Sequence, residues 1–264
     1  MLISVYLVKY LDWGIQGVAI GTVIAQYLGL AIAIFLFFWK YFSLRTYIST
    51  EWKKRSSFSR FLKINSDIFL RTVCLTLAFS FFYSKSAEAG EVILAVNVVL
   101  QQFLNWMSYG IDGFAYAAES MVGKYFGAKD EKKTFAAIKL SFQWGFVLAL
   151  LFSLYFFIDY SDLILLFSSQ ENVIQASHEF RIWMAVFPLI AFACYIWDGV
   201  FIGLTASVSM RNSMLAAFVI YLLSYYILLP YSVDKAIWIA LMLFLLSRGL
   251  FQGVLFARKK LELN

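Results

Sequence analysis

Long apolar runs, each able to cross a lipid bilayer, constrain the fold of this 264-residue chain more than any other feature. The first, Gly14 to Phe38, contains no ionised residue. It is longer than the roughly 20 residues that a helix needs to span the hydrocarbon core. Six further runs follow: Ser66–Ser84, Glu91–Gly127, Thr134–Ile158, Val173–Ala206, Asn212–Leu229 and Ala236–Ala257. Because 62% of the residues are hydrophobic and only 14% are charged, a soluble domain is excluded. We predict an all-α, polytopic transmembrane helical bundle with seven spans.

Basic residues gather in alternating loops and thereby predict the orientation of the chain. One side of the membrane receives the Lys40–Lys63 segment, Lys124, Lys129, Lys132, Lys133, Arg211 and Arg258–Lys260, whereas the other side has only Lys9, Lys85 and Lys235. We expect the basic side to be cytoplasmic, with the N-terminus outside and the C-terminus inside. The net charge of +6 therefore indicates topology and not a surface for nucleic acid.

Polar side chains recur along one face of the Glu91–Gly127 run. They are Asn97, Gln101, Asn105, Ser108, Asp112 and Glu119, at steps of four, four, three, four and seven residues. This spacing places them on the same side of a helix. Because lipid surrounds such a bundle, we predict that this face lines a cavity, contacts neighbouring helices, or does both.

Five charged residues are expected inside the membrane, in two layers. By distance from the cytoplasmic ends of their spans, Arg71 and Glu119 form a shallow pair, while Asp112, Asp198 and Arg248 lie deeper. Arg248 could pair with Asp198 or with Asp112. Two acids and one base leave one deep carboxylate in excess, which favours the binding of a proton and indicates a proton-coupled carrier. Ion pairs that only hold helices together are the alternative, and for Arg71 and Glu119 the preferred one.

Other reactive residues give no indication of an enzyme. The single histidine, His178, is predicted at the outer end of a span, and Cys74 and Cys194 lie within apolar runs. The sequence has no His-Glu-x-x-His, Gly-x-Ser-x-Gly or Walker-type motif. We predict that the chain is not an enzyme and has no metal centre built from histidine.

Five motifs stand in an order that resembles a known family. They are Trp13–Thr22 (WGIQGVAIGT), Ile64–Thr72 (INSDIFLRT), Tyr109–Glu119 (YGIDGFAYAAE) with the glycines after it, Asp198–Gly203 (DGVFIG) and Met210–Met214 (MRNSM). Over essentially the whole chain they resemble the multidrug and toxic compound extrusion (MATE) family, in its DNA-damage-inducible F (DinF)-like branch.

The resemblance implies a twelve-helix, cation-coupled exporter with two six-helix lobes around a central cavity. Residues 1–39 would then form the last helix of the first lobe, residues 40–65 a basic cytoplasmic linker, and residues 66–264 the complete second lobe. Asp198 matches an acid that takes part in cation binding in some members, which makes it the place for a coupling Na⁺. Asp112 and Glu119 match acids of the DinF-like pattern. The family's proton-binding aspartate on its first helix has no counterpart here, and the odd number of spans indicates missing upstream sequence.

We therefore expect a secondary active transporter of the bacterial inner membrane that exchanges H⁺ or Na⁺ for organic cations, drugs or other amphiphiles, with no cofactor besides the coupling ion. Its expected partners are the lipid bilayer, the substrate, and either the missing first lobe or a second copy of the chain. Two alternatives stay open. One is a lipid-precursor flippase of the same superfamily, and the other is a truncated membrane remnant that binds partners without transporting.

Overall fold

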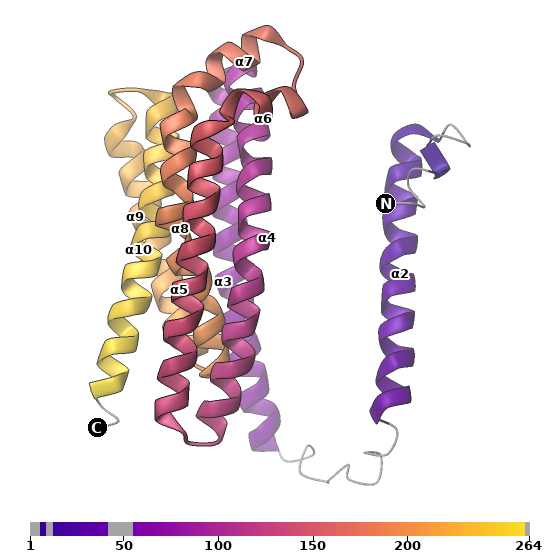
Figure 1. Cartoon of the computed structure of the whole chain (residues 1–264), viewed down its shortest axis with the longest axis vertical. Coiled ribbons are helices and arrows are strands. Elements are labelled where there is room, and N and C mark those ends of the chain that lie inside the picture. The colour runs from indigo at the N-terminus through magenta and orange to yellow at the C-terminus, as the bar shows by residue number, and fades with distance from the viewer. Residues whose placement is uncertain (1–5, 9–12, 42–54, 262–264) are drawn as a thin grey trace. The chain divides into compact units, whose positions relative to one another are not determined.

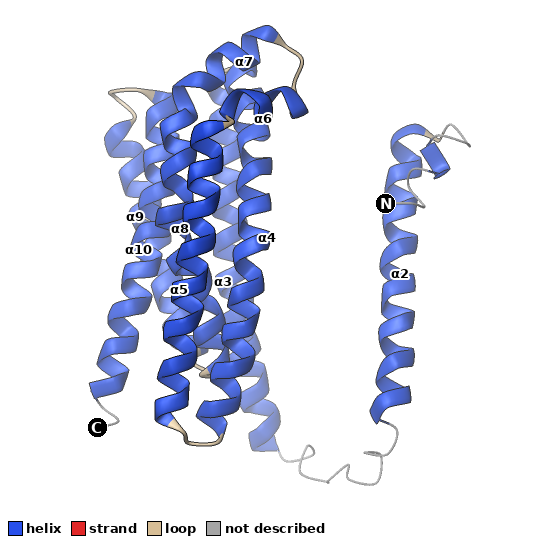
Figure 2. Cartoon of the chain, viewed as in Figure 1, coloured by secondary structure: helices blue, strands red, loops and turns tan. Residues whose placement is uncertain are grey.

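The computed structural model describes residues 6–8, 13–41 and 55–261, and these residues form helices without any strand (Figures 1 and 2). Within this part of the chain, seven helices are long and apolar enough to cross a membrane. The predicted all-α bundle with seven spans is therefore confirmed. The chain divides into two units, Met1–Ser59 and Arg60–Asn264.

The first unit contains the helix α2 (Gly14–Tyr41). Its side chains are apolar on all sides and nearly all of them are exposed. A helix of this kind is stable only where lipid or other helices cover it, because water would hydrate its apolar surface unfavourably. Residues 42–54, which make up much of the predicted linker, lie outside the described residues.

The second unit is a bundle of long helices with a short helical cap. In Figure 1, α6 (Tyr160–Phe167) and α7 (Glu171–Ser177) lie at one end of the bundle, where α5 gives way to α8. The predicted fifth span is interrupted at the 3₁₀ turn His178–Phe180, which contains the only histidine of the sequence. The long helices are α3 (Arg55–Glu88), α4 (Glu91–Gly127), α5 (Glu131–Ile158), α8 (Arg181–Gly203), α9 (Ser207–Leu228) and α10 (Val233–Leu261).

The helix α3 begins earlier than the sequence pattern predicted. The apolar run was expected to start at Ser66, but the helix starts at Arg55 and its membrane-compatible part starts at Phe61. Arg71 consequently lies about ten residues, or about 15 Å of helix, inside this span. It therefore lies further from the start of its apolar helix than predicted.

Glycines allow the backbones of α4 and α8 to approach closely. Gly199 and Gly203 are four residues apart on α8 and so share one face. A Cβ atom on Gly199 would overlap the carbonyl oxygen of Ala115, and one on Gly203 would lie 2.7 Å from the carbonyl oxygen of Glu119. Small residues at this spacing are typical of tight helix crossings in membranes, where van der Waals contact drives association.

This crossing gives a first testable prediction. Gly199→Ala should force α4 and α8 apart, and we expect a loss of about 1–3 kcal/mol in stability, typical of overpacking. The measurement is the thermal midpoint of the purified protein in detergent, followed by tryptophan fluorescence. Gly113→Ala is the matched control, because a Cβ there meets nothing within 4 Å. Equal midpoints for Gly199→Ala and the control would contradict the close crossing.

Candidate functional site

A carboxylate held by two arginines lies within the bundle. Asp198 of α8 accepts hydrogen bonds at Oδ2 from Arg71 Nη2 of α3 and from Arg248 Nη2 of α10. Gln252, one turn after Arg248, donates from Nε2 to the other carboxylate oxygen at 2.8 Å. The side chain of Asp198 thus joins three helices. We call Arg71, Asp198, Arg248 and Gln252 the charge cluster.

The members of the charge cluster differ in their freedom to move. Arg248 is 1% exposed and Gln252 is fully buried, so both are enclosed by packed neighbours. The side chain of Arg71 is 19% exposed, whereas that of Asp198 is 9% exposed. Arg71 is therefore the cluster member with most room to change partner.

The charge cluster also contains polar atoms without partners. The Nε atoms of Arg71 and Arg248 and the Oε1 atom of Gln252 are buried and make no hydrogen bond. Buried polar atoms are nearly always paired with protein groups or water, because an unpaired one costs about 1–3 kcal/mol. These atoms therefore offer binding capacity for water or for another polar group next to Asp198.

Asp112 of α4 lies beside the charge cluster without a direct partner. It is half-buried and within electrostatic range of Asp198, Arg71 and Arg248. Among the described residues it makes no hydrogen bond or ion pair. Of the two partners left open for Arg248, the structure shows Asp198. Asp112 is thus the carboxylate of this group that remains available.

The predicted shallow pair of Arg71 with Glu119 is wrong. Arg71 contacts Asp198 instead, a residue of the layer that was predicted to lie deeper. The expected excess of carboxylate is also wrong, because Arg71 joins Arg248 and two arginines balance Asp112 and Asp198. Four charges with no net charge are far cheaper to bury than an unpaired ion.

The first residue of the predicted polar stripe joins helices. Asn97 is fully buried; its Nδ2 donates to Ser86 Oγ at 2.8 Å, and its Oδ1 accepts from Trp238 Nε1 at 2.9 Å. These bonds connect α3, α4 and α10. Of the roles left open for this face, Asn97 therefore takes the contact with neighbouring helices, because its amide is enclosed by its own bundle.

The rest of the stripe leads toward Asp112. Gln101 is 4% exposed and donates from Nε2 to Asn105 Oδ1 at 3.4 Å, while its Oε1 is buried without a partner. Asn105 and Ser108 are half-buried, and Ser108 Oγ donates to the carbonyl oxygen of Asn105 at 3.0 Å. For these three residues, lining of a transport cavity stays a prediction.

A second, partly buried ion pair was missed from the sequence. Asp67 of α3 is 3% exposed and binds Arg211 Nη1 at 2.6 Å and Ser207 Oγ at 2.8 Å, both from the start of α9. The motifs Ile64–Thr72 and Met210–Met214 each carry one partner, so their charges were the available signal. This pair fixes the first part of α3 against the turn between α8 and α9.

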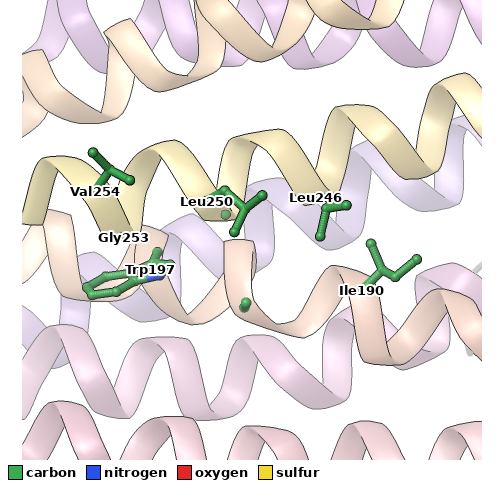
Figure 3. A pocket seen from close by; sticks show the side chains of 8 residues that line it. Ile190, Trp197, Leu246, Leu250, Gly253 and Val254 are labelled. Carbon is green, nitrogen blue, oxygen red and sulfur yellow. The ribbon is translucent and has the colours of Figure 1, made fainter. Parts of the chain in front are cut away.

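An apolar groove runs between α8 and α10 (Figure 3). Its volume is about 320 Å³ and its walls include three small residues, Ala193, Gly249 and Gly253, with Trp197 beside them. No charged residue lines it. Acyl chains or an apolar helix suit such walls better than an ion does.

A larger pocket lies between α4 and the end of α8, at about 520 Å³. It is lined by Tyr116, Glu119, Ser120, Gly123, Ile202 and Gly203. Glu119, expected as a partner of Arg71, opens onto this pocket. The structure therefore gives Glu119 and Asp112, which share one helical face, two different surroundings.

Comparison with known proteins agrees with this architecture. The MatE family model matches residues 68–227. The chain is 36% identical to DNA damage-inducible protein F of Escherichia coli over 265 residues, covering 98% of this chain and 56% of the relative. It is 23% identical to the chloroplastic protein DETOXIFICATION 44 of Arabidopsis thaliana, covering 92% of this chain and 46% of that protein. The chain thus spans about half the length of the curated relatives it matches.

Solved structures show the same fold. The structure of a mutant of the Vibrio cholerae MATE transporter VcmN superposes with a TM-score of 0.82 at 18% identity, over 100% of this chain and 60% of that one. A MOP superfamily transporter from Pyrococcus furiosus superposes with a TM-score of 0.81 at 18% identity, over 99% and 59%. The family match, the relatives and the seven spans together confirm the predicted resemblance: the chain is a multi-pass membrane protein that belongs to the MATE family of transporters, in its DinF-like branch.

Proposed function

We propose that the chain forms the last helix of the first lobe and the complete second lobe of a cation-coupled exporter. The exporter would lie in a bacterial inner membrane and move organic cations, drugs or other amphiphiles outward in exchange for inward H⁺ or Na⁺. The observation that carries this proposal is the charge cluster with Asp112 beside it. Charges at this depth are costly, and in membrane proteins they typically mark ion or proton pathways.

The proposed orientation follows from the basic residues. Lys124, Lys129 and Arg211 lie at the same side as the basic C-terminal end, if the spans alternate in direction. Since Lys and Arg accumulate in cytoplasmic loops, this side would be cytoplasmic. The C-terminus would then be inside and the N-terminus outside.

Within the site, we assign cation binding to Asp112 and an anchoring role to Asp198. Asp198 has both oxygens occupied by Arg71, Arg248 and Gln252, so its negative charge is already neutralised. A Na⁺ ion at Asp198 would face two guanidinium groups at contact distance, which is electrostatically unfavourable. Asp112 has no such partner and can bind a proton without displacing one. The geometry therefore favours H⁺ over Na⁺.

Arg71 supplies the proposed link between proton binding at Asp112 and the packing of the helices. When Asp112 is ionised, it competes with Asp198 for the guanidinium of Arg71. When Asp112 is protonated, this competition ends and Arg71 remains on Asp198. Because Arg71 belongs to α3 whereas the two acids belong to α4 and α8, its choice of partner alters how these helices contact each other. A change of this kind is what alternating access requires.

A complete pathway would need a second lobe against this one. That lobe could be the first half of a longer protein or a second copy of the chain. Either arrangement would enclose a cavity between two bundles, as in carriers built from repeats.

Asp112→Asn should abolish proton-driven efflux, because the amide can neither bind nor release a proton. The fold should be retained, because the amide has the charge of the protonated acid and the hydrogen bonds of Asp198 remain. The measurement is ethidium efflux from membrane vesicles against an imposed pH gradient, with the chain coexpressed with the first half of its E. coli relative. We expect at least a tenfold lower rate. Asp159→Asn, at an exposed connector residue, is the matched control. Wild-type, pH-dependent efflux in Asp112→Asn would contradict the assignment.

The anchoring role of Asp198 predicts strong coupling with Arg248. Arg248→Gln should cost about 3–5 kcal/mol of stability, because it removes one partner of a buried ion pair. Asp198→Asn should cost a similar amount, since both arginines lose their carboxylate. The double variant should be more stable than the sum of the single losses by at least about 1 kcal/mol. Thermal midpoints of the three purified variants test this, and strict additivity would rule out a direct, energetically important pair.

A further inference from the structure

The pocket between α4 and the end of α8 contains a carboxylate without a counter-charge. Glu119 is half-buried and lines this pocket of about 520 Å³, and within the described part of the chain it forms no ion pair. A carboxylate in such a place is costly unless a cation neutralises it. The pocket is therefore suited to a positively charged ligand.

The opposite wall of the pocket is the C-terminal end of a helix. The helix α8 ends at Gly203, whose carbonyl oxygen faces α4 near Gly123, at 3.5 Å from where a Cβ on Gly123 would lie. The carbonyl oxygens of Val200, Phe201 and Ile202 accept hydrogen bonds from the turn after α8. The Gly203 carbonyl, at the negative end of the helix, faces α4 and favours a cation nearby. Glu119 and the C-terminal end of α8 therefore both make the electrostatic potential in the pocket more negative.

The absence of side chains at Gly123 and Gly203 keeps the pocket open. Both glycines line it, and the close crossing of α4 and α8 sets its floor. Ser120 adds a hydroxyl group to the wall. A pocket of this volume with one carboxylate is too large and too poor in oxygen ligands for a bare metal ion, which needs about six or more of them.

Tyr116 adds a feature that selects for organic cations. It is 68% exposed, lines the pocket and precedes Glu119 by three residues, so both side chains lie on one face of α4. The face of an aromatic ring attracts cations that water holds weakly, such as quaternary ammonium and phosphonium groups. The combination of a carboxylate and an aromatic ring suits a bulky monovalent organic cation.

We propose that Tyr116 and Glu119, together with the C-terminal end of α8, form a binding site for the cationic group of an organic substrate, separate from the charge cluster. Glu119 follows Asp112 by seven residues on the same helical face, about 10 Å further along the axis. A cation in the pocket would lie on the side of α4 that leads to Asp112. The site deepens the proposed export function and rests on it for its biological meaning.

The test is direct binding of tritiated tetraphenylphosphonium to the purified 264-residue protein in detergent, by equilibrium dialysis with a micelle-only blank. We expect saturable binding by the wild type. Glu119→Gln should weaken the affinity at least tenfold, because it removes the charge and keeps the shape. Tyr116→Leu should weaken it severalfold, whereas Tyr116→Phe should retain it because the ring remains.

Two controls separate this site from general effects of charge and hydrophobicity. Glu131→Gln removes an exposed carboxylate at the start of α5, beyond the turn that follows α4, and should leave the affinity unchanged. Tetraphenylborate has the same shape as the probe and the opposite charge, so it should not compete at a concentration at which unlabelled tetraphenylphosphonium does.

The proposal is overturned if the wild type shows no saturable binding, if Glu119→Gln binds as well as the wild type, or if Glu131→Gln weakens binding equally. Binding in detergent at a fixed pH requires no ion gradient and no second lobe. Failure of the export function would therefore appear as absent efflux with Glu119-dependent binding intact. Failure of this site would appear as efflux that depends on Asp112 with binding indifferent to Glu119.

Discussion

The neutralisation of Asp198 by Arg71 and Arg248 is the interaction on which the arrangement of the bundle depends. The three side chains come from α8, α3 and α10, and each would be a costly buried ion without the others. A helix that moved away from this centre would leave an unpaired charge in an apolar surrounding. The bundle is thereby restricted to arrangements in which these helices meet at Asp198. Gln252 strengthens the restriction because it satisfies the second carboxylate oxygen.

Packing and charge are coupled at a single turn of α8. Asp198 directly precedes Gly199, the residue whose missing side chain allows the backbone of α4 to approach at Ala115. Asp112 lies three residues before Ala115 on α4, so the contact that brings the helices together also brings Asp112 beside the charge cluster. The position of the Asp112 carboxylate is thus set by the close backbone packing at Gly199 and not by a polar contact of its own.

The spans could be predicted from the sequence because lipid requires every backbone group to be bonded within its own helix, which leaves long apolar runs as the signal. Pairing was harder. Arg71 was placed too shallow, since polar residues such as Lys63 and Asn65 hide the true start of α3 from a hydropathy pattern. Helical periodicity put Asn97 on the correct face, but it could not show that Trp238, distant in the sequence, meets it there. Periodicity defines a face; only the tertiary fold defines what covers it.

The two carboxylates on this face of α4 are in opposite electrostatic surroundings, and this difference bears on how a carrier can separate its substrate from its coupling ion. Asp112 lies near Arg71 and Arg248, which repel any bulky cation. Glu119 lies near the electronegative end of α8, which attracts one. A proton can still reach Asp112, because it adds almost no volume and forms a covalent bond to the carboxylate. In the proposed exporter, the arginines of the charge cluster would therefore exclude the organic cation from the proton site while Glu119 retains it two helical turns away.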